Sequence, residues 1–215
     1  MQEVPLRSKY QPVYSPFSCA LYQRCLHKAN GLFAVVCMVV MSLSVSPLAF
    51  GRTLYTGEYE MKAVFLYQLL QFAEWPQKAF VDNEHMITIG ILGKDPFGNM
   101  FKPVEGGAID GRSLVIKRFE EGASAESLKA CQLLFISSSV GEDVGVVLES
   151  LNEYPVLTVS EVEGFAELGG MVNFVVKKDK LKLEINKGAA ERVGIKFRSK
   201  LLRLAVRIVE GGYAD

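Results

Sequence analysis

Few residues of this chain have the types and spacing that catalysis requires. The 215 residues include two histidines, and only His85 lies beyond the first fifty positions. The serines at 137–139 would need His85 as their general base, and they lack the Gly-x-Ser-x-Gly turn that presents such a nucleophile. The sequence also contains no Cys-x-x-Cys and no His-Glu-x-x-His zinc motif. We therefore predict no catalytic residue, no metal site and no enzyme activity, and we interpret His85 as a surface residue.

The loop at residues 93–98, GKDPFG, is the nearest approach to a phosphate-binding motif. Its glycines could let backbone N–H groups reach an anion, but Asp95 would repel that anion. We predict no nucleotide and no other cofactor. Cys131 opens an apolar segment, which indicates a buried small side chain rather than a reactive thiol.

Another set of residues is better suited to binding. Trp75 is the only tryptophan, and Gln71 and Glu74 lie shortly before it. Trp75 could anchor the core beneath the following loop, or it could line a ligand or partner cleft together with Gln71 and Glu74. The sequence leaves both interpretations open.

Basic residues are frequent near the C-terminus. Those at 198–209, which include Arg207, form one stripe on an expected helix and would be solvated or would meet an acidic partner. Asn173 and Asn186 fall in strands or at their ends, where capping and turn formation are the simplest roles and ligand contact is the alternative. The ligand or partner contacts that we predict come from Gln71, Glu74, Trp75, Asn186, Arg198, Lys200 and Arg203.

A long first helix must position the tryptophan. Residues 58–75 contain no Gly or Pro, and apolar residues recur there at three- and four-residue spacing, which predicts a helix. Thr56 is the expected N-cap, and Pro76 marks the expected end because it disfavours helical backbone at Trp75. The apolar arc of this helix is wide, which is typical of a helix that packs on a sheet.

Short apolar segments alternate with helical ones through the rest of the chain. This order predicts a parallel sheet with helices on both faces, and residues 177–179 predict the turn of a hairpin. The predicted fold class is three-layer α/β, with a mainly parallel central sheet of about six strands and a C-terminal antiparallel hairpin. We expect strands at residues 86–92, 113–119, 132–136, 155–159, 171–176 and 180–185, and helices at 58–75, 95–102, 124–129, 141–151, 186–192 and 198–209.

The first 51 residues have the pattern of an export signal. Basic residues precede a long apolar run, and Ala49-Phe50-Gly51 places small residues where a signal peptidase reads them. We predict cleavage after Gly51 and a single domain at 52–215. An uncleaved membrane anchor is the alternative, because the apolar run approaches the length of a membrane span. Cleavage would leave Cys131 as the only cysteine, and the formal net charge of zero gives no support to nucleic-acid binding.

Several motifs, in one order, resemble those of a known family. The first helix reads Lys-Ala-x-Phe-Leu-Tyr and runs into Phe-x-Glu-Trp-Pro, within EYEMKAVFLYQLLQFAEWP at residues 58–76. The later motifs are LGKDPFG (92–98), CQLLFIS (131–137), PVLTVSEVEGFAELGGMVNF (155–174) and LKLEIN followed by SKLLRLA (within 181–205). On these residues the chain resembles the YfiR/HmsC-like family of small periplasmic regulators, over residues 57–209.

This resemblance implies a function that the residues alone do not indicate. Members of the family bind the periplasmic sensor domain of an inner-membrane diguanylate cyclase and hold it inactive. An outer-membrane lipoprotein can sequester them, which raises cyclic di-GMP and promotes biofilm formation. By resemblance we expect a periplasmic repressor with these two partners, no cofactor and no nucleic acid.

Self-association is also expected. Family members are dimers, and an exposed hairpin edge together with a broad apolar first helix would favour contact between copies. We therefore expect a homodimer. The alternative function is a periplasmic small-solute binding protein that uses the cleft near Trp75.

Overall fold

The computed structural model describes residues 50–80 and 85–210, so the predicted export signal lies almost entirely outside the described residues. The chain from Gly51 onward forms a compact unit of its own, which is described by itself. Its helices are α3 (Phe50–Phe72), α4 (Ala125–Leu128), α5 (Val144–Leu151), α6 (Lys187–Arg192) and α7 (Ser199–Leu202), with the 3-10 helices η3 (Gln77–Phe80) and η4 (Ser138–Asp143). Its strands are β1 (Ala73–Glu74), β2 (Met86–Leu92), β3 (Ala108–Ile109), β4 (Arg112–Phe119), β5 (Leu133–Ile136), β6 (Leu157–Ser160), β7 (Val172–Lys177), β8 (Lys180–Asn186), β9 (Lys196–Phe197) and β10 (Ala205–Val209).

Eight of the strands form one sheet in the order β10-β8-β7-β6-β5-β2-β4-β3. The series from β4 to β7 is parallel, whereas β7 and β8 pair antiparallel as a hairpin. The structure thus confirms the mainly parallel α/β sheet with its C-terminal hairpin. The sheet is wider than predicted because a short strand is added at each edge, β3 beside β4 and β10 beside β8.

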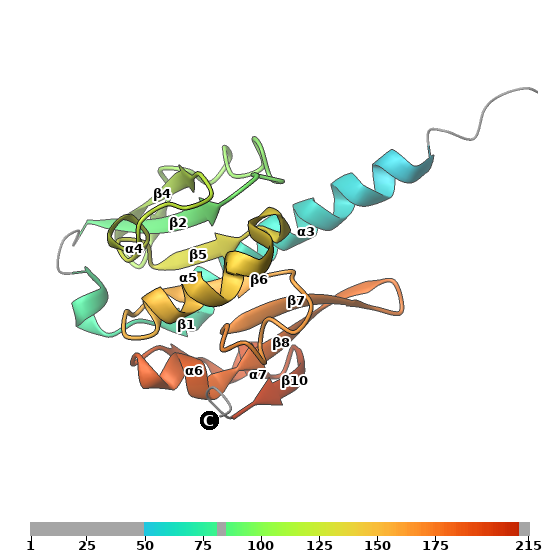
Figure 1. Ribbon diagram of the computed structural model, residues 1–215. Coiled ribbons are helices and arrows are strands. Elements are labelled where there is room, and N and C mark those ends of the chain that lie inside the picture. The colour runs from blue at the N-terminus through green and yellow to red at the C-terminus, as the bar shows by residue number, and fades with distance from the viewer. Residues whose placement is uncertain (1–49, 81–84, 211–215) are drawn as a thin grey trace, which may run out of the picture. The chain divides into compact units, whose positions relative to one another are not determined.

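Helices cover both faces of this sheet, with α3 and α5 on opposite sides (Figure 1). Side chains alternate across β5, so that Leu133 and Phe135 join the apolar cluster under α3 while Leu134 and Ile136 join the cluster under α5. All four side chains are buried. This is the pattern expected of a central strand that is covered on both faces, and it confirms the three layers.

The long first helix is confirmed, but both of its predicted ends are wrong. α3 begins at Phe50, so Thr56 lies inside the helix and is not its N-cap. The helix ends at Phe72, because the next two residues form β1 and pair with β9. A tertiary strand pairing therefore ends the helix before Pro76 does.

The segment after β2 is a turn rather than the predicted helix at 95–102. The Asp95 carboxylate accepts hydrogen bonds from the backbone N–H groups of Phe97 (2.7 Å) and Gly98 (3.2 Å), as a helix cap would. Arg118 on β4 holds the other oxygen of Asp95 at 2.7 Å. The positive φ of 52° at Gly98 then turns the chain away from a helical path.

The predicted helix at 198–209 is wrong for most of its length. Only α7 is helical there, and the chain continues as β10, which pairs in parallel with β8. The sequence of β10, AVRIV, is rich in β-branched residues, which favour a strand where an open sheet edge is available. β10 therefore covers the hairpin edge that was expected to be exposed, and Leu204, which lies between α7 and β10, is 47% exposed.

Two local predictions in the C-terminal part are confirmed. Lys178 and Asp179 form the hairpin turn with φ values of 53° and 56°, as a two-residue type I′ turn requires. Asn186 caps α6, because its Oδ1 accepts the backbone N–H of Ala189 at 2.9 Å. Gly194, with φ of 85°, follows the end of this helix.

Candidate functional site

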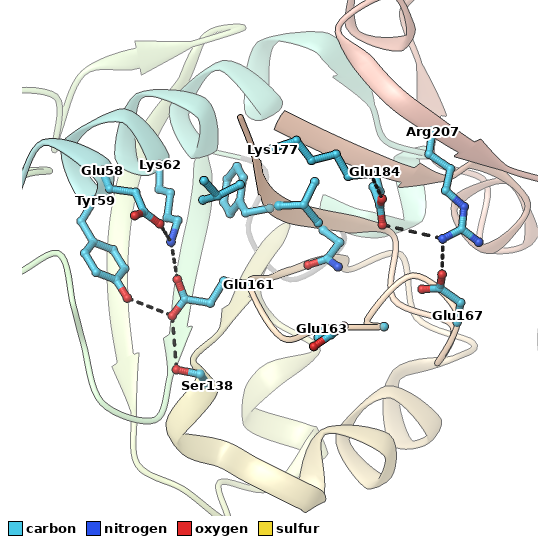
Figure 2. Close-up of a pocket in the computed structure, with 15 residues that line it drawn as sticks. Glu58, Tyr59, Lys62, Ser138, Glu161, Glu163, Glu167, Lys177, Glu184 and Arg207 are labelled. Carbon is cyan, nitrogen blue, oxygen red and sulfur yellow. Dashed lines mark hydrogen bonds and ion pairs between the residues drawn. The ribbon is translucent and has the colours of Figure 1, made fainter. Parts of the chain in front are cut away.

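A cleft of about 740 Å³ lies at the carboxyl ends of the parallel strands. Glu161 follows the last residue of β6, and Ser138 follows β5 by two positions. The carboxyl ends of parallel strands meet at one edge of the sheet, where open α/β sheets form their crevices. α3 borders one side of the cleft and the β7–β8 hairpin borders the other, as Figure 2 shows.

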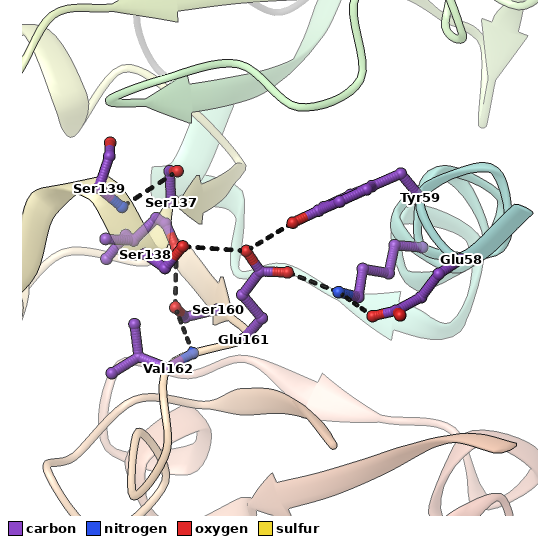
Figure 3. A network of polar contacts seen from close by, with 10 residues as sticks. Glu58, Tyr59, Ser137, Ser138, Ser139, Ser160, Glu161 and Val162 are labelled. Carbon is purple, nitrogen blue, oxygen red and sulfur yellow. Dashed lines mark hydrogen bonds and ion pairs between the residues drawn. The ribbon is translucent and has the colours of Figure 1, made fainter. Parts of the chain in front are cut away.

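One end of the cleft carries a network centred on Glu161, drawn in Figure 3. Its Oε1 accepts hydrogen bonds from the hydroxyl groups of Tyr59 (3.0 Å) and Ser138 (3.3 Å). Its Oε2 accepts a hydrogen bond from Lys62 Nζ at 2.5 Å. Three elements, α3, η4 and the β6 terminus, are thereby joined through a single carboxylate.

Lys62 is the buried cation of this network, with 4% of its surface exposed. Glu58, one helical turn earlier, places its Oε1 2.5 Å from Lys62 Nζ. The same ammonium group lies 4.4 Å from the centre of the Tyr59 ring. Because a buried lysine is costly unless its charge is paired, these neighbours are what permit Lys62 to occupy this position.

The other end of the cleft carries a second ionic cluster, built on β8 and β10. Glu184 accepts a hydrogen bond from Lys177 Nζ at 2.9 Å, and Arg207 lies 3.9 Å from its other oxygen. Arg207 also donates to Glu167, which lowers the pKa of Glu167 and raises the pKa of Arg207. The two clusters flank a less polar stretch of β7, where Val175 and Val176 line the cleft.

Asn173, on β7 between the two clusters, is 1% exposed. Neither its Nδ2 nor its Oδ1 has a hydrogen-bond partner within the described ranges. A buried amide that is left unpaired costs about 1–3 kcal/mol. The cleft thus contains an amide NH2 group and an amide oxygen that have no partner among the described residues and could bind a molecule placed there.

The arrangement favours binding over reaction. The serines at 137–139 follow the carboxyl end of β5, whereas His85 precedes the amino end of β2, which is parallel to β5. Seven residues of strand, about 23 Å, separate these two edges of the sheet, so His85, the one histidine among the described residues, is out of reach of the serines. Among the residues that the structure describes, no group of His, Cys, Asp and Glu could hold a metal ion.

The residues predicted around Trp75 lie at the other edge of the sheet. A groove of about 350 Å³ is lined there by Glu74, Trp75 and Arg198, beside Ile87 and Arg112 near the amino ends of β2 and β4. Glu74 and Arg198 form an ion pair at 3.1 Å. Trp75 therefore lies at the edge of the sheet opposite the larger cleft.

Trp75 has features of both interpretations. Its ring packs against the apolar cluster under α3, and its Nε1 donates to the Gln132 carbonyl at 3.0 Å. It is only partly buried and lines the groove. The structure therefore makes Trp75 a core anchor with one exposed side.

The remaining predicted residues are dispersed. Asn186 is buried, and besides capping α6 it donates to the Ala166 carbonyl at 2.9 Å, so both ends of its amide are used within the chain. Gln71 and Arg203 are exposed. Lys200 is exposed above the Phe72 ring. The expected basic stripe does not form, because Arg207 lies on β10 rather than on α7.

The sequence analysis missed Lys62, Glu161 and Glu184 as site residues. Lys62 stands inside the apolar arc of the first helix, four residues after Glu58, and that spacing was a usable signal for a paired buried charge. Glu161 directly follows a buried strand, which is where functional residues of parallel sheets are found. Glu184 gave no signal, because it alternates with apolar residues as an outward-facing strand residue would.

The fold and the cleft define a three-layer α/β protein with a crevice at the carboxyl edge of its sheet, where open α/β sheets commonly bind ligands. The YfiR/HmsC-like family model matches residues 59–206, and the chain belongs to this family. The family comprises periplasmic regulators of diguanylate cyclase signalling and is regulatory rather than catalytic. No curated protein matches the chain. Across the described residues, no helix has both the length and the apolar character that a membrane span requires.

Proposed function

We propose that this chain is a periplasmic repressor of an inner-membrane diguanylate cyclase. It binds the periplasmic sensor domain of the cyclase, lowers cyclic di-GMP and restrains biofilm formation. The observation that carries the proposal is the family match over residues 59–206. The absence of a histidine near the serines at 137–139 in the described structure supports a role through binding rather than chemistry.

The mechanism is a shift between two states of the cyclase. A protein that binds the inactive state more tightly than the active state moves the equilibrium toward inactivity, by no more than the difference in affinity. Repression is therefore stoichiometric. An outer-membrane lipoprotein that competes for the repressor relieves it. Export with cleavage after Gly51 and assembly as a homodimer complete the proposal.

The groove at Trp75 and the neighbouring basic residues are the surface that we propose for the partner. Gln71, Lys200 and Arg203 are exposed, Lys200 lies over the Phe72 ring, and the Glu74–Arg198 pair borders the groove. Exposed cations of this kind favour an acidic partner surface and raise the rate of association. Asn186 is buried, so we propose that it acts on the partner only indirectly, by capping α6.

The experiment is co-purification from envelope extract, with a C-terminal tag on the full chain. The unaltered protein is expected to recover a diguanylate cyclase. Arg203→Glu should reduce this recovery, because it reverses a charge on the proposed surface. Lys102→Glu is the matched control, since Lys102 is also exposed but lies in the turn after β2. Equal recovery with both variants would remove the basic surface from the proposal, and recovery of no cyclase with any of the three would oppose the repressor function itself.

A second candidate function is periplasmic binding of a small solute in the groove at Trp75. One observation favours it: Arg112, which lines this groove, has a buried Nε without a hydrogen-bond partner in the described part of the chain. A bound acceptor would satisfy this group. A thermal-shift screen with small carboxylates, compared between the unaltered chain and Arg112→Met, tests this function.

A further inference from the structure

The interior of the sheet contains an open strand edge. β7 pairs with β8 over all of its residues, but its register with β6 covers only Val172 and Asn173. β6 ends at Ser160, and the chain then leaves the sheet in a turn. On that side no described strand pairs with residues 174–177. Figure 1 shows the β7–β8 hairpin extending past the end of β6.

The hairpin geometry decides which backbone groups face this open edge. The two-residue turn makes Lys177 and Lys180 a hydrogen-bonded pair, and such pairs alternate with non-hydrogen-bonded pairs along an antiparallel ladder. Phe174 and Val176 belong to the second kind, so their N–H and C=O groups point away from β8. They point toward the cleft that these two residues help to line.

The side chains beside this edge are also unpaired. The Asn173 amide lies at the point where the β6 pairing stops, is 1% exposed and has no partner among the described residues. Val176 is 56% exposed although it is apolar. An added strand would bond the free backbone groups, cover Val176 and bring a peptide group to the Asn173 amide.

The charges of the cleft select the kind of strand. Five carboxylates line it against three cations, and each cation already pairs with a carboxylate. Glu163 alone has no ion pair within the described ranges. The excess negative charge favours a segment that carries lysine or arginine.

We propose that the cleft binds an extended basic peptide segment as an added strand along residues 174–177 of β7. The open edge spans four residues, about 13 Å, so the segment needs about four to six residues. This inference goes beyond the proposed repressor function and does not depend on it, because the Trp75 groove lies at the other edge of the sheet.

The experiment is amide hydrogen exchange, resolved by residue, on the full chain with a synthetic peptide. The probe is a capped hexapeptide of alternating valine and lysine, and the matched probe has glutamate in place of lysine. In the free protein, the Phe174 and Val176 amides should exchange faster than those of Val175 and Lys177, which bond to β8. The lysine peptide should slow exchange at Phe174 and Val176, and should bind at least about threefold more tightly than the glutamate peptide.

Two substitutions at one position separate a strand addition from other contacts. Val176→Pro removes the free N–H but no bond of the β7–β8 ladder, because that N–H faces the open edge. It should weaken binding of the lysine peptide by about tenfold. Val176→Thr keeps the N–H and should bind with little change. The melting temperatures of both variants establish that they are folded.

Three results would overturn the proposal. Exchange at Phe174 and Val176 that is already slow in the free protein, and becomes slower as the protein concentration is raised, would mean that a second copy of the chain occupies the edge. Unchanged exchange with millimolar lysine peptide would mean that no such strand binds. Equal binding by Val176→Pro and Val176→Thr would mean that the peptide binds elsewhere.

Discussion

At the scale of single residues, the buried charge of Lys62 decides how the carboxyl edge of the sheet is built. Glu161 and Glu58 both lie 2.5 Å from its Nζ, and Glu161 also holds Tyr59 and Ser138. The net contribution of such a network to the free energy of folding is small, because its buried charges must be desolvated. Its main effect is to fix the positions of the side chains that it joins. Removing the Glu161 carboxylate alone should therefore destabilise the fold more than removing the charges of Glu161 and Lys62 together.

Glu161→Gln tests this asymmetry. The substitution leaves Lys62 buried with Glu58 as its only carboxylate partner, and should cost about 2–3 kcal/mol in the free energy of unfolding. Adding Lys62→Met removes the stranded charge and should recover part of the loss. Urea denaturation of the two single variants and the double variant gives the coupling free energy. Additive losses would mean that Lys62 and Glu161 do not interact as described.

Cys131 gives a prediction in the alkaline range. Burial raises the pKa of its thiol to about 12 from 9.0, partly offset by Lys117. The unfolded thiol ionises first as the pH rises, so its contribution to stability is complete below about pH 9 and is lost progressively toward about pH 12. The stability of the unaltered chain should therefore fall, relative to Cys131→Ala, across that range. A difference between the two proteins that does not change with pH would contradict a buried neutral thiol.

Trp75 can be tested for its role in the core. Trp75→Phe keeps most of the ring but loses the bond to the Gln132 carbonyl, which should cost about 1 kcal/mol. Trp75→Ala also loses the packing under α3 and should cost about 3 kcal/mol or more. Thermal unfolding measures both. Unchanged melting temperatures would mean that Trp75 does not stabilise the core and only lines the groove.

At the scale of elements, the hairpin turn carries strain. Lys178 and Asp179 both adopt left-handed backbone, which costs about 1–2 kcal/mol for a residue such as lysine and less for aspartate. Lys178→Asn with Asp179→Gly should therefore raise the free energy of unfolding by about 1 kcal/mol. Lys178→Gln removes the lysine charge without relieving the strain, and should have little effect. Denaturant midpoints compare the three proteins, and a destabilised Asn-Gly variant would count against the turn type.

Elements determined by local sequence were predicted well. The central strands, the hairpin turn, the Asn186 cap and the body of the first helix each have a periodic pattern or a turn residue of their own. The predictions at 95–102 and 198–209 were wrong for a different reason. There the local signal for a helix was overridden by contacts distant in sequence, with Arg118 in the first case and with β8 in the second.

The candidate site was predicted less well than the fold. Its cleft joins α3, the end of β6, the hairpin and β10, and only the topology of the sheet brings these segments together. The residues chosen from the sequence were chosen by type, as a single tryptophan or a run of cations. The burial of Lys62 and of the Asn173 amide, in contrast, follows from the tertiary fold.

At the scale of the whole molecule, the sheet has a hollow at each of two opposite edges. The Trp75 groove lies near the strand amino ends, and the larger cleft lies at the carboxyl ends, so two partners could be held without competing for one surface. Separate surfaces would let the cyclase and the lipoprotein bind the repressor at the same time. The competition that we propose instead predicts that the cyclase and the lipoprotein bind the same surface.

The stoichiometric mechanism gives a prediction at this scale. In a reconstituted membrane, added protein should inhibit the diguanylate cyclase until it reaches a fixed molar ratio to the sensor domain, and further addition should have no effect. Inhibition at a small fraction of that ratio would indicate catalysis rather than binding. The titration is measured as the rate of cyclic di-GMP synthesis, with Lys102→Glu as a control for nonspecific charge effects.

The central claim is repression of a diguanylate cyclase, and the most direct test is the level of cyclic di-GMP in cells that lack this chain. We expect the level to rise on deletion, and to return when the full chain is restored from a plasmid. Restoration of Arg203→Glu should return it only in part. An unchanged cyclic di-GMP level on deletion, in cells shown to produce the protein before deletion, would contradict the repressor function.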